Sequence, residues 1–428
     1  ALASLALAGT RTTLSGRGLP GLPMVRALQQ LGVAVEHNLE QGEYEVVGVG
    51  LDGWSVPEAI DCGPSMVTLL TLSSLLSGMN CTTTLHSEAP RAPRVMAAVA
   101  QTLRRRGAQL EGSLRADQPR ALYSPYTIAT TGDGAPLSPL DIELVGGSDT
   151  EIHHAMKSAA LLSGLFSDGP TRIHEAPVSD ARLERLLAAA GLALEASGPF
   201  TVMADSKPPG TPSLGDAMLS GDSGLGWTLL AAAFGVPGSD VTVRTVNIDP
   251  TQSGTTEALR DAGCHIALRI RAEQLGQTTA DIRIASGGPG RALAMVGERA
   301  GRSSTSLPCL AAIASNCPSA AASLLSVPTS HAPQTAKTIS VLDRFGIASR
   351  SVEEGLSVDG AGGAALQAAD IDAEGDADIA MMATSLALRA SGPCTIHGVT
   401  GITAVYPRFV ATLRALGARI EVHEALSP

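Results

Sequence analysis

The sequence reads Leu28-Gln29-Gln30-Leu31-Gly32-Val33 near its beginning, and five similar phrases follow. Each phrase has a leucine four residues before a glycine and an apolar residue directly after it. The six glycines are Gly32, Gly107, Gly191, Gly263, Gly346 and Gly417. A glycine at the end of a helical stretch supplies the left-handed backbone that lets the helix stop. Recurrence at intervals of 71 to 84 residues predicts one supersecondary unit used six times.

The segments around these glycines follow one order. A helix of small residues comes first, as in 156–165 and 228–234, and an alternating, threonine-rich strand follows, as in 82–86. An amphipathic helix such as 182–190 ends at the glycine, and another strand, such as 419–422, comes after it. Because the first helix is rich in alanine, we expect it to pack closely on all sides.

These units predict an α/β (α+β) fold with two lobes. Three β-α-β units in each lobe would place buried helices inside and sheets outside, as an inside-out α/β barrel. Lobe one is predicted to span residues 1–215, with repeats 1–3, and lobe two residues 216–428, with repeats 4–6. The boundary follows a Pro/Gly/Ser-rich stretch at 207–213. A two-lobe protein commonly binds its ligand in the cleft between the lobes.

Composition excludes several classes of protein. The formal net charge of −11 argues against a nucleic-acid-binding protein, although an acidic protein can hold an anionic ligand in a local basic pocket. The six cysteines form no CxxC pair, which predicts free thiols in a reducing cytoplasm. Neither a signal peptide nor a run of membrane-spanning length is found, and a leucine-rich stretch at 66–79 is predicted to be a buried helix. The chain begins at Ala1 within a helical pattern, so we expect further residues before it.

Few residues outside the repeats suggest chemistry. His153 and His154 have no third ligand at a convincing spacing, so no metal and no cofactor are expected. Arg104–Arg106 precede a helix-ending glycine, where solvated cations favour the helix dipole. Asp180 is expected to cap the helix that follows it.

Several short segments of the chain resemble sequence motifs of a known protein family. Lys157–Leu165 is similar to a KSAxLLAGL helix, and Ser220–Gly224 is similar to a GDxSSA turn. Asp376 with Ile379–Met382 resembles a DHRxAM motif, and Tyr406–Phe409 resembles a closing SFPxF segment. Through these phrases the chain is identified as a member of the EPSP synthase (3-phosphoshikimate 1-carboxyvinyltransferase) family, with the enolpyruvyl-transferase fold, over essentially its whole length. In that fold an N-terminal strand normally completes lobe two.

The resemblance implies an activity. Members of the family join phosphoenolpyruvate to a hydroxyl of shikimate 3-phosphate and release phosphate. Both substrates are polyanions, so the cleft needs several arginine and lysine side chains. A carboxylate beside the reacting hydroxyl and a nearby acid/base group would move the protons.

The first lobe departs from the family at its binding positions. The NAGTxxR phosphate-binding loop corresponds to Asp61–Val67, with Asp61 in place of the asparagine and Val67 in place of the arginine. A carboxylate gained and a guanidinium lost would repel an anion. The Ser-x-Gln pair that holds the shikimate ring corresponds to His153-His154-Ala155.

The second lobe also lacks charged residues that the family has at its catalytic and binding positions. The Asp-Glu pair before Tyr-Pro corresponds to Thr305-Ser306, and the acid/base glutamate corresponds to Gln334. Lys337 replaces an anion-binding arginine, the DHR motif reads Asp376-Ala377-Asp378, and the late lysine falls at about Ala404. Each such group stabilises the transition state of enolpyruvyl transfer. Their joint loss therefore predicts that this chain does not perform that reaction.

The polar residues that remain define the candidate site. The candidate catalytic residues are His153, His154 and Asp376, and the candidate substrate-binding residues are Lys157, Arg91, Arg94 and Lys337.

Three functions stay open. The first is a repurposed enzyme that performs an elimination, dehydration or cyclisation on a small ring or acyl acid in a biosynthetic pathway. The second is an inactive homologue that binds or scaffolds a protein partner, and the third is enolpyruvyl transfer itself, in the shikimate pathway of aromatic amino acid biosynthesis. The expected ligand is a small anionic or ring-containing molecule between the lobes, with no nucleic acid and no membrane as partner.

Overall fold

The structure is a computed structural model that describes residues 10–15, 22–38, 43–50, 53–89, 92–115, 118–129, 135–145, 150–176, 178–203, 215–285, 288–319, 321–326, 332–353 and 355–423. The linker stretch predicted at 207–213 and the candidate residue Arg91 lie outside these ranges. The chain divides into two compact units. The first contains the described residues up to Leu219 and the segment Glu273–Gln277, and the second contains those of Ser220–Ala272 and from Thr278 onward.

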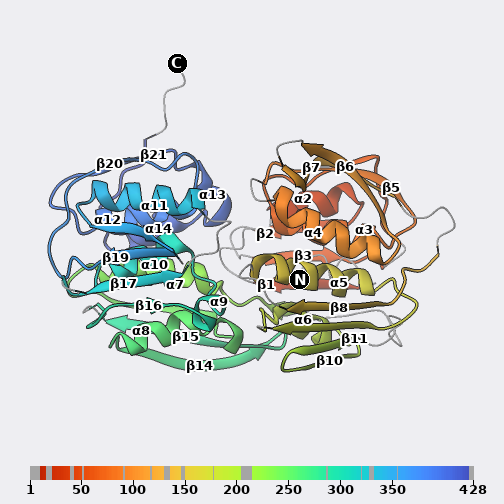
Figure 1. The fold of residues 1–428 in the computed structure, drawn as a ribbon, viewed down its shortest axis with the longest axis horizontal. Coiled ribbons are helices and arrows are strands. Elements are labelled where there is room, and N and C mark those ends of the chain that lie inside the picture. Colours follow the sequence, from red (N-terminus) through yellow and green to blue (C-terminus); the bar gives the residue numbers. More distant parts are fainter. Residues whose placement is uncertain are drawn as a thin grey trace, which may run out of the picture. The chain divides into compact units, whose positions relative to one another are not determined.

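The first unit alternates strands and helices along the chain (Figure 1). Its elements are β1 (Arg11–Ser15), α2 (Leu22–Gln30), β2 (Ala34–Asn38), β3 (Glu43–Val47), β4 (Ala59–Asp61), α3 (Met66–Leu76), β5 (Thr82–His86), α4 (Ala92–Arg105), β6 (Gln109–Arg115), β7 (Gln118–Ala129), β8 (Leu140–Val145), α5 (Thr150–Gly164), β9 (Thr171–Ala176), α6 (Arg182–Ala189), β10 (Leu194–Ser197), β11 (Phe200–Met203) and β12 (Ala217–Met218).

The elements from Ser220 onward follow a similar alternation. They are α7 (Ser223–Phe234), β13 (Asp240–Asn247), η1 (Pro250–Gln252), α8 (Gly254–Asp261), β14 (Ile266–Gln274), β15 (Gln277–Ala285), β16 (Ala294–Met295), α9 (Glu298–Gly301), α10 (Leu307–Ala314), β17 (Ala322–Ser326), α11 (Ala332–Arg344), β18 (Ser349–Val352), β19 (Gly355–Asp359), β20 (Asp370–Asp372), α12 (Ala377–Ala387), β21 (Thr395–His397), α13 (Thr400–Val405) and α14 (Phe409–Ala415).

The sheets of the two units are small and mixed. In the first unit the strand orders are β12-β1-β3-β2, β4-β5-β7-β6 and β10-β11-β9-β8. Each of these sheets combines one parallel pair with antiparallel pairs. In the second unit the orders are β13-β15-β14, β16-β17-β19-β18 and β20-β21.

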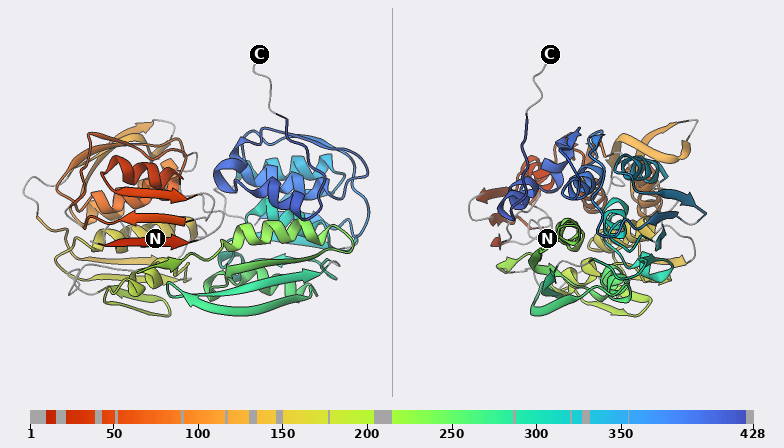
Figure 2. Two further views of the ribbon diagram at one scale, coloured as in Figure 1. Left: turned by 180° about the vertical axis from the view of Figure 1, so that it is seen from behind. Right: turned by 90° about the vertical axis from the view of Figure 1, so that its left-hand side faces the viewer.

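Apolar helices form the core of each unit. Helix α3 buries eight residues and packs on α4 and α5, which also contact each other. In the second unit α7, α10 and α12 pack on one another, with the strands around them (Figures 1 and 2). This arrangement confirms the α/β fold class and the buried helix predicted from the stretch 66–79, because both require apolar helices inside and strands outside.

The backbone confirms the role predicted for the repeated glycines. All six have positive φ angles, from +77° at Gly346 to +103° at Gly417. A side chain is strained in that conformation, so glycine allows each helix to end and the chain to turn. Strand β5 coincides with the predicted strand 82–86.

Two predictions are wrong. Residues 419–422 form no strand, because none of the described residues pairs with them. Arg106 is not solvated as predicted but is only 1% exposed. Its guanidinium donates to the carbonyl oxygens of Ser138 and Ala160, each at 2.9 Å, and to the hydroxyl of Thr171, so buried backbone acceptors replace water.

The cysteines behave as the sequence predicts. All six are free, and Cys62, Cys264, Cys309 and Cys317 are buried. Burial, with the Asp61 carboxylate adding to it, raises the pKa of the Cys62 thiol to about 12. Within the described residues, no helix combines the length and the apolar character that crossing a membrane requires.

Candidate functional site

Helix α5 carries three of the candidate residues in the first unit. His153 and His154 lie in its early turns and are half-buried, whereas Lys157, one turn later, is completely buried. A spacing of three or four residues places side chains on one helical face, so His154 and Lys157 share a face of α5. The charges around them come from β9, from α6 and from Asp180 between these two elements.

Two carboxylates hold the Lys157 ammonium. Its Nζ atom lies 2.9 Å from Oε1 of Glu175 on β9 and 2.7 Å from Oε1 of Glu184 on α6. The hydroxyl of Ser179 donates to the other oxygen of Glu175 at 2.7 Å. A buried lysine needs such partners because an isolated charge is very costly away from water. Lys157, expected from the sequence to bind substrate, therefore has its charge balanced inside the core.

Glu184 is the less satisfied of the two carboxylates. Its Oε2 atom is buried without a hydrogen-bond partner among the described residues. Burial raises the pKa of Glu184, and the nearby Lys157 ammonium only partly opposes this effect. One ammonium shared by two carboxylates leaves an excess of negative charge, which favours a proton on Glu184.

His154 lies beside this cluster. Its Nδ1 atom is buried, and no described residue forms a hydrogen bond with it. Burial lowers the pKa of His154, although the carboxylate of Asp180 raises it in part. Asp180 itself accepts a hydrogen bond from the backbone N–H of Arg182 at 2.9 Å, but the prediction that it caps the helix is wrong, because Ala181 is the N-cap residue of α6 and no side chain caps this helix. A neutral imidazole at this point can accept or donate a proton.

The resemblance equates the loop before α3 with the family's phosphate-binding loop. Oδ1 of Asp61 accepts the backbone N–H of Gly63 at 2.8 Å, and Gly63 has a φ of +57°. Ser65 caps α3 by accepting the N–H of Thr68 at 3.2 Å. Val67, at the position that the resemblance gives to an arginine, is 69% exposed. The Asp61 carboxylate thus already accepts the Gly63 N–H, a donor that an incoming anion would need.

The two candidate arginines lie at and just before the start of α4. Arg94 is exposed near the start of α4, and Arg91 precedes the described part of that helix.

The second unit gathers its candidate residues around the start of α12. Asp376 caps this helix, and its Oδ1 atom accepts the N–H groups of Asp378 and Ile379 at 3.0 and 3.2 Å. Lys337 on α11 forms an ion pair with Glu374 at 2.6 Å. Nε2 of Gln334 lies 3.5 Å from Oδ2 of Asp378. This group therefore contains three carboxylates and a single ammonium, that of Lys337.

The two positions that the resemblance gives to a catalytic Asp-Glu pair, Thr305 and Ser306, hold neutral side chains. Thr305 is buried, and its hydroxyl lies 2.7 Å from that of Thr255. Ser306 is the residue before α10. A threonine hydroxyl held in this way has no proton-transfer ability near neutral pH, in contrast to a carboxylate.

The structure thus shows one group of candidate residues within each unit. His154 and Lys157 belong to the first, and Lys337 and Asp376 belong to the second. Glu175 and Glu184 were missed by sequence reasoning, because their partner lies 18 and 27 residues away and no local pattern marks it. Among the described residues, no three His, Cys, Asp or Glu side chains are arranged to hold a metal ion.

Comparison with known proteins identifies the family. A family model for EPSP synthase (3-phosphoshikimate 1-carboxyvinyltransferase) matches residues 3–413. The chain belongs to the EPSP synthase family. It is 31% identical over 412 residues to 3-phosphoshikimate 1-carboxyvinyltransferase of Methylococcus capsulatus, covering 94% of this chain and 87% of the relative. The enzyme of that name from Acidithiobacillus ferrooxidans is 30% identical over 427 residues, covering 98% of this chain and 93% of the relative.

Solved structures share the fold of this EPSP synthase family member. EPSP synthase from Acinetobacter baumannii superposes with a TM-score of 0.81 at 24% identity, covering 99% of this chain and 94% of that one. The enolpyruvyl transferase NikO from Streptomyces tendae gives a TM-score of 0.68 at 15% identity, covering 98% of this chain and 92% of that one. At these identities the likeness shows the fold alone.

Proposed function

We propose that this chain is a divergent member of the EPSP synthase family that does not transfer the enolpyruvyl group from phosphoenolpyruvate at the family's rate. It acts instead on a small ring or acyl acid that carries less negative charge. The observation that carries the proposal is the hydrogen bond between Asp61 and the Gly63 N–H, at 2.8 Å in the loop before α3.

The electrostatics of that loop support the proposal. A phosphate group bound there would approach the Asp61 carboxylate and find the exposed Val67 side chain instead of a guanidinium. Like charges near a protein surface repel by about 4 kcal/mol at 4 Å for an effective dielectric constant near 20, and solvent screening lowers this value at an exposed carboxylate such as that of Asp61. A ligand with a single carboxylate can keep its charge away from the loop, whereas a phosphate bound there cannot.

The second unit supports the same conclusion. The Lys337 ammonium is paired with Glu374, so a trianion such as phosphoenolpyruvate would have to compete with a carboxylate for it. Gln334 and Thr305 stand where the family places proton-transferring carboxylates, and neither side chain can replace them. Elimination, dehydration or cyclisation would need fewer anion contacts than enolpyruvyl transfer, with His153, His154 or Asp376 as the available proton carriers.

Direct titration tests the preference for low charge. Calorimetry with shikimate and with shikimate 3-phosphate compares one ring with and without a phosphate group. We expect shikimate to bind at least as tightly as its 3-phosphate. Clearly tighter binding of the 3-phosphate would show that the loop accepts the dianion and would refute the proposal.

Standard enolpyruvyl transfer is the second candidate. Identity of about 30% over nearly the whole chain to proteins named 3-phosphoshikimate 1-carboxyvinyltransferase favours it. In that case residues outside the described ranges, such as Arg91, would have to supply the anion contacts. Phosphate release from phosphoenolpyruvate and shikimate 3-phosphate separates the two candidates.

A further inference from the structure

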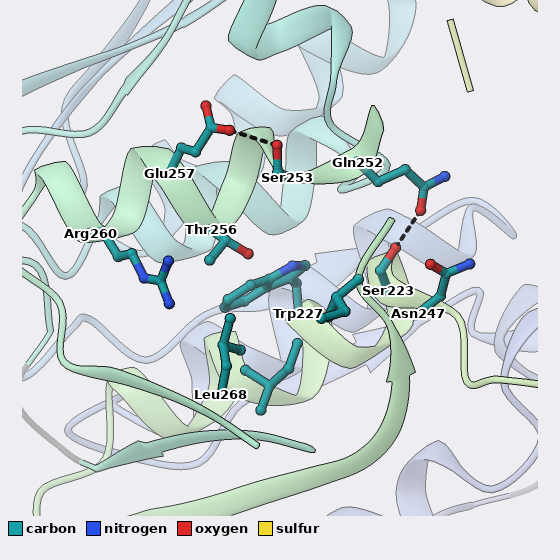
Figure 3. A pocket seen from close by; sticks show the side chains of 11 residues that line it. Ser223, Trp227, Asn247, Gln252, Ser253, Thr256, Glu257, Arg260 and Leu268 are labelled. Carbon is teal, nitrogen blue, oxygen red and sulfur yellow. Dashed lines mark hydrogen bonds between the residues drawn. The ribbon is translucent and has the colours of Figure 1, made fainter. Parts of the chain in front are cut away.

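The second unit contains a pocket that none of the candidate catalytic and substrate-binding residues lines. It opens between α7, α8 and the sheet β13-β15-β14, and its cavity volume is about 170 Å³ (Figure 3). For comparison, an apolar cavity of about 150 Å³ holds a benzene molecule. The pocket therefore has room for a single six-membered ring.

One side of the pocket is apolar. The indole of Trp227 on α7 lies between the side chains of Thr256 and Leu268 in Figure 3. Ile248 and Ile282 complete this wall. Trp227 is only 2% exposed, so the surrounding core fixes its ring and leaves little of it open to a ligand. Leu268 and Ile248 are more exposed, and a ligand ring in the pocket would gain mainly by burial against this apolar wall.

A cation without a partner lies at the edge of this pocket. Arg260 on α8 is exposed, and within the described part of the chain its guanidinium forms no ion pair and no side-chain hydrogen bond. Thr256, one turn earlier on the same helix, adds a hydroxyl donor. Guanidinium and hydroxyl donors together suit a carboxylate, because an arginine offers two parallel N–H groups to its two oxygens.

The neighbouring carboxylate does not occupy this cation. Glu257 also lines the pocket, but both its oxygens accept hydrogen bonds from Arg302, at 3.0 and 2.8 Å, and Ser253 donates to it at 2.6 Å. The hydrogen bond from Ser253, followed by that from Arg302, lowers the pKa of Glu257. Its charge is thus balanced by Arg302, and the positive charge of Arg260 remains for a ligand.

We propose that this pocket is a binding site for a small monocyclic carboxylic acid, whose ring packs against the apolar wall of Leu268, Ile248 and Trp227 and whose carboxylate binds Arg260. The site is formed by residues of the second unit alone, and it is independent of the reaction proposed above. Its ligand class follows from three features together: the volume of one ring, an apolar wall and a guanidinium that no described residue pairs.

Tryptophan fluorescence tests the proposal directly. The chain has two tryptophans, so the variant Trp54→Phe leaves Trp227 as the only emitter. Benzoate is the probe, and benzamide is the uncharged ligand of the same shape. We expect a saturable change in emission with benzoate. In the Arg260→Gln variant the benzoate dissociation constant should rise at least about tenfold, as for loss of a charge-assisted hydrogen bond, and benzamide should bind weakly to both proteins.

A matched variant separates the site from general charge effects. Arg269→Gln also removes one exposed arginine, but Arg269 follows Leu268 on β14 and therefore points to the other face of the strand. This variant should bind benzoate like the parent protein. A change in emission that is linear in benzoate without saturation, or equal affinity in the parent and the Arg260→Gln variant, would overturn the proposal.

Discussion

Nζ of Lys157 lies 2.7 Å from Oε1 of Glu184, and both side chains are at most 2% exposed. A second carboxylate, that of Glu175, shares the same ammonium at 2.9 Å. These contacts tie helix α5 to strand β9 and helix α6 in the core of the first unit. The cluster therefore couples the stability of this unit to its charge state.

Replacing Lys157 by methionine should strongly destabilise the protein. The substitution keeps the length of the side chain but leaves two buried carboxylates without their cation. Breaking a buried ion pair in this way costs about 3–5 kcal/mol in the free energy of unfolding. Urea unfolding followed by circular dichroism measures the loss. Lys337→Met, which removes an exposed ion pair with Glu374, is the control and should cost less than about 1 kcal/mol.

Glu184→Gln should change how stability depends on pH. The pKa of Glu184 is raised in the folded protein, so the folded state holds a proton that the unfolded state has lost. The contribution of Glu184 is therefore present below its unfolded pKa, about 4.3, and is lost as pH rises through the folded pKa. Relative to Glu184→Gln, the parent protein should become less stable as pH rises above this value. Glu195→Gln, at an exposed position on β10, is the control, and an identical pH trend in both variants would contradict the account.

His154→Asn should protect the protein from mild acid. The pKa of His154 is lowered by burial, so below about pH 6.5 the unfolded state binds a proton that the folded state excludes. The parent protein should therefore lose stability as pH falls from 6.5 to 5, and the variant should lose less. His86→Asn, at an exposed histidine of the same unit, serves as the comparison. Equal acid sensitivity of the parent and His154→Asn would show that His154 does not titrate as proposed.

Restoring the family residues before α3 should restore anion binding. Asp61→Asn combined with Val67→Arg removes the carboxylate at the Gly63 N–H and adds a guanidinium at an exposed position. We expect phosphoenolpyruvate to bind about tenfold more tightly or better in calorimetry, as for a hydrogen bond to a charged group. Glu58→Gln removes a nearby exposed charge outside the loop and should have little effect. Equal gains in both proteins would mean that net charge, not the loop, controls affinity.

The fold could be predicted where local chemistry decides it. Gly107 and Gly417 have the largest positive φ angles among the repeated glycines, and the helices end where the sequence predicts. Arg419–Val422 has the alternation of a strand, yet it forms none because a strand also needs a partner, which local sequence does not specify. The burial of Arg106 could not be predicted for a similar reason. Its acceptors Ser138, Ala160 and Thr171 lie far from it in the sequence.

The candidate site was harder to predict for the same reason. The spacing of His154 and Lys157 suffices to place them on one helical face, but no local pattern indicates that Glu175 and Glu184 enclose the ammonium. Asp376 looked like a proton carrier, and the structure shows that its carboxylate also caps α12. Residue types suggest chemistry, whereas only the tertiary neighbours decide whether a charge is free for a ligand.

The most direct test of the central claim is phosphate release from phosphoenolpyruvate and shikimate 3-phosphate. The purified protein is compared with 3-phosphoshikimate 1-carboxyvinyltransferase of Methylococcus capsulatus at equal concentration. The account predicts release at least about a thousandfold slower, because loss of even one preorganised charged group costs a hundredfold to a thousandfold. Release at a comparable rate would contradict the account and assign enolpyruvyl transfer to this chain.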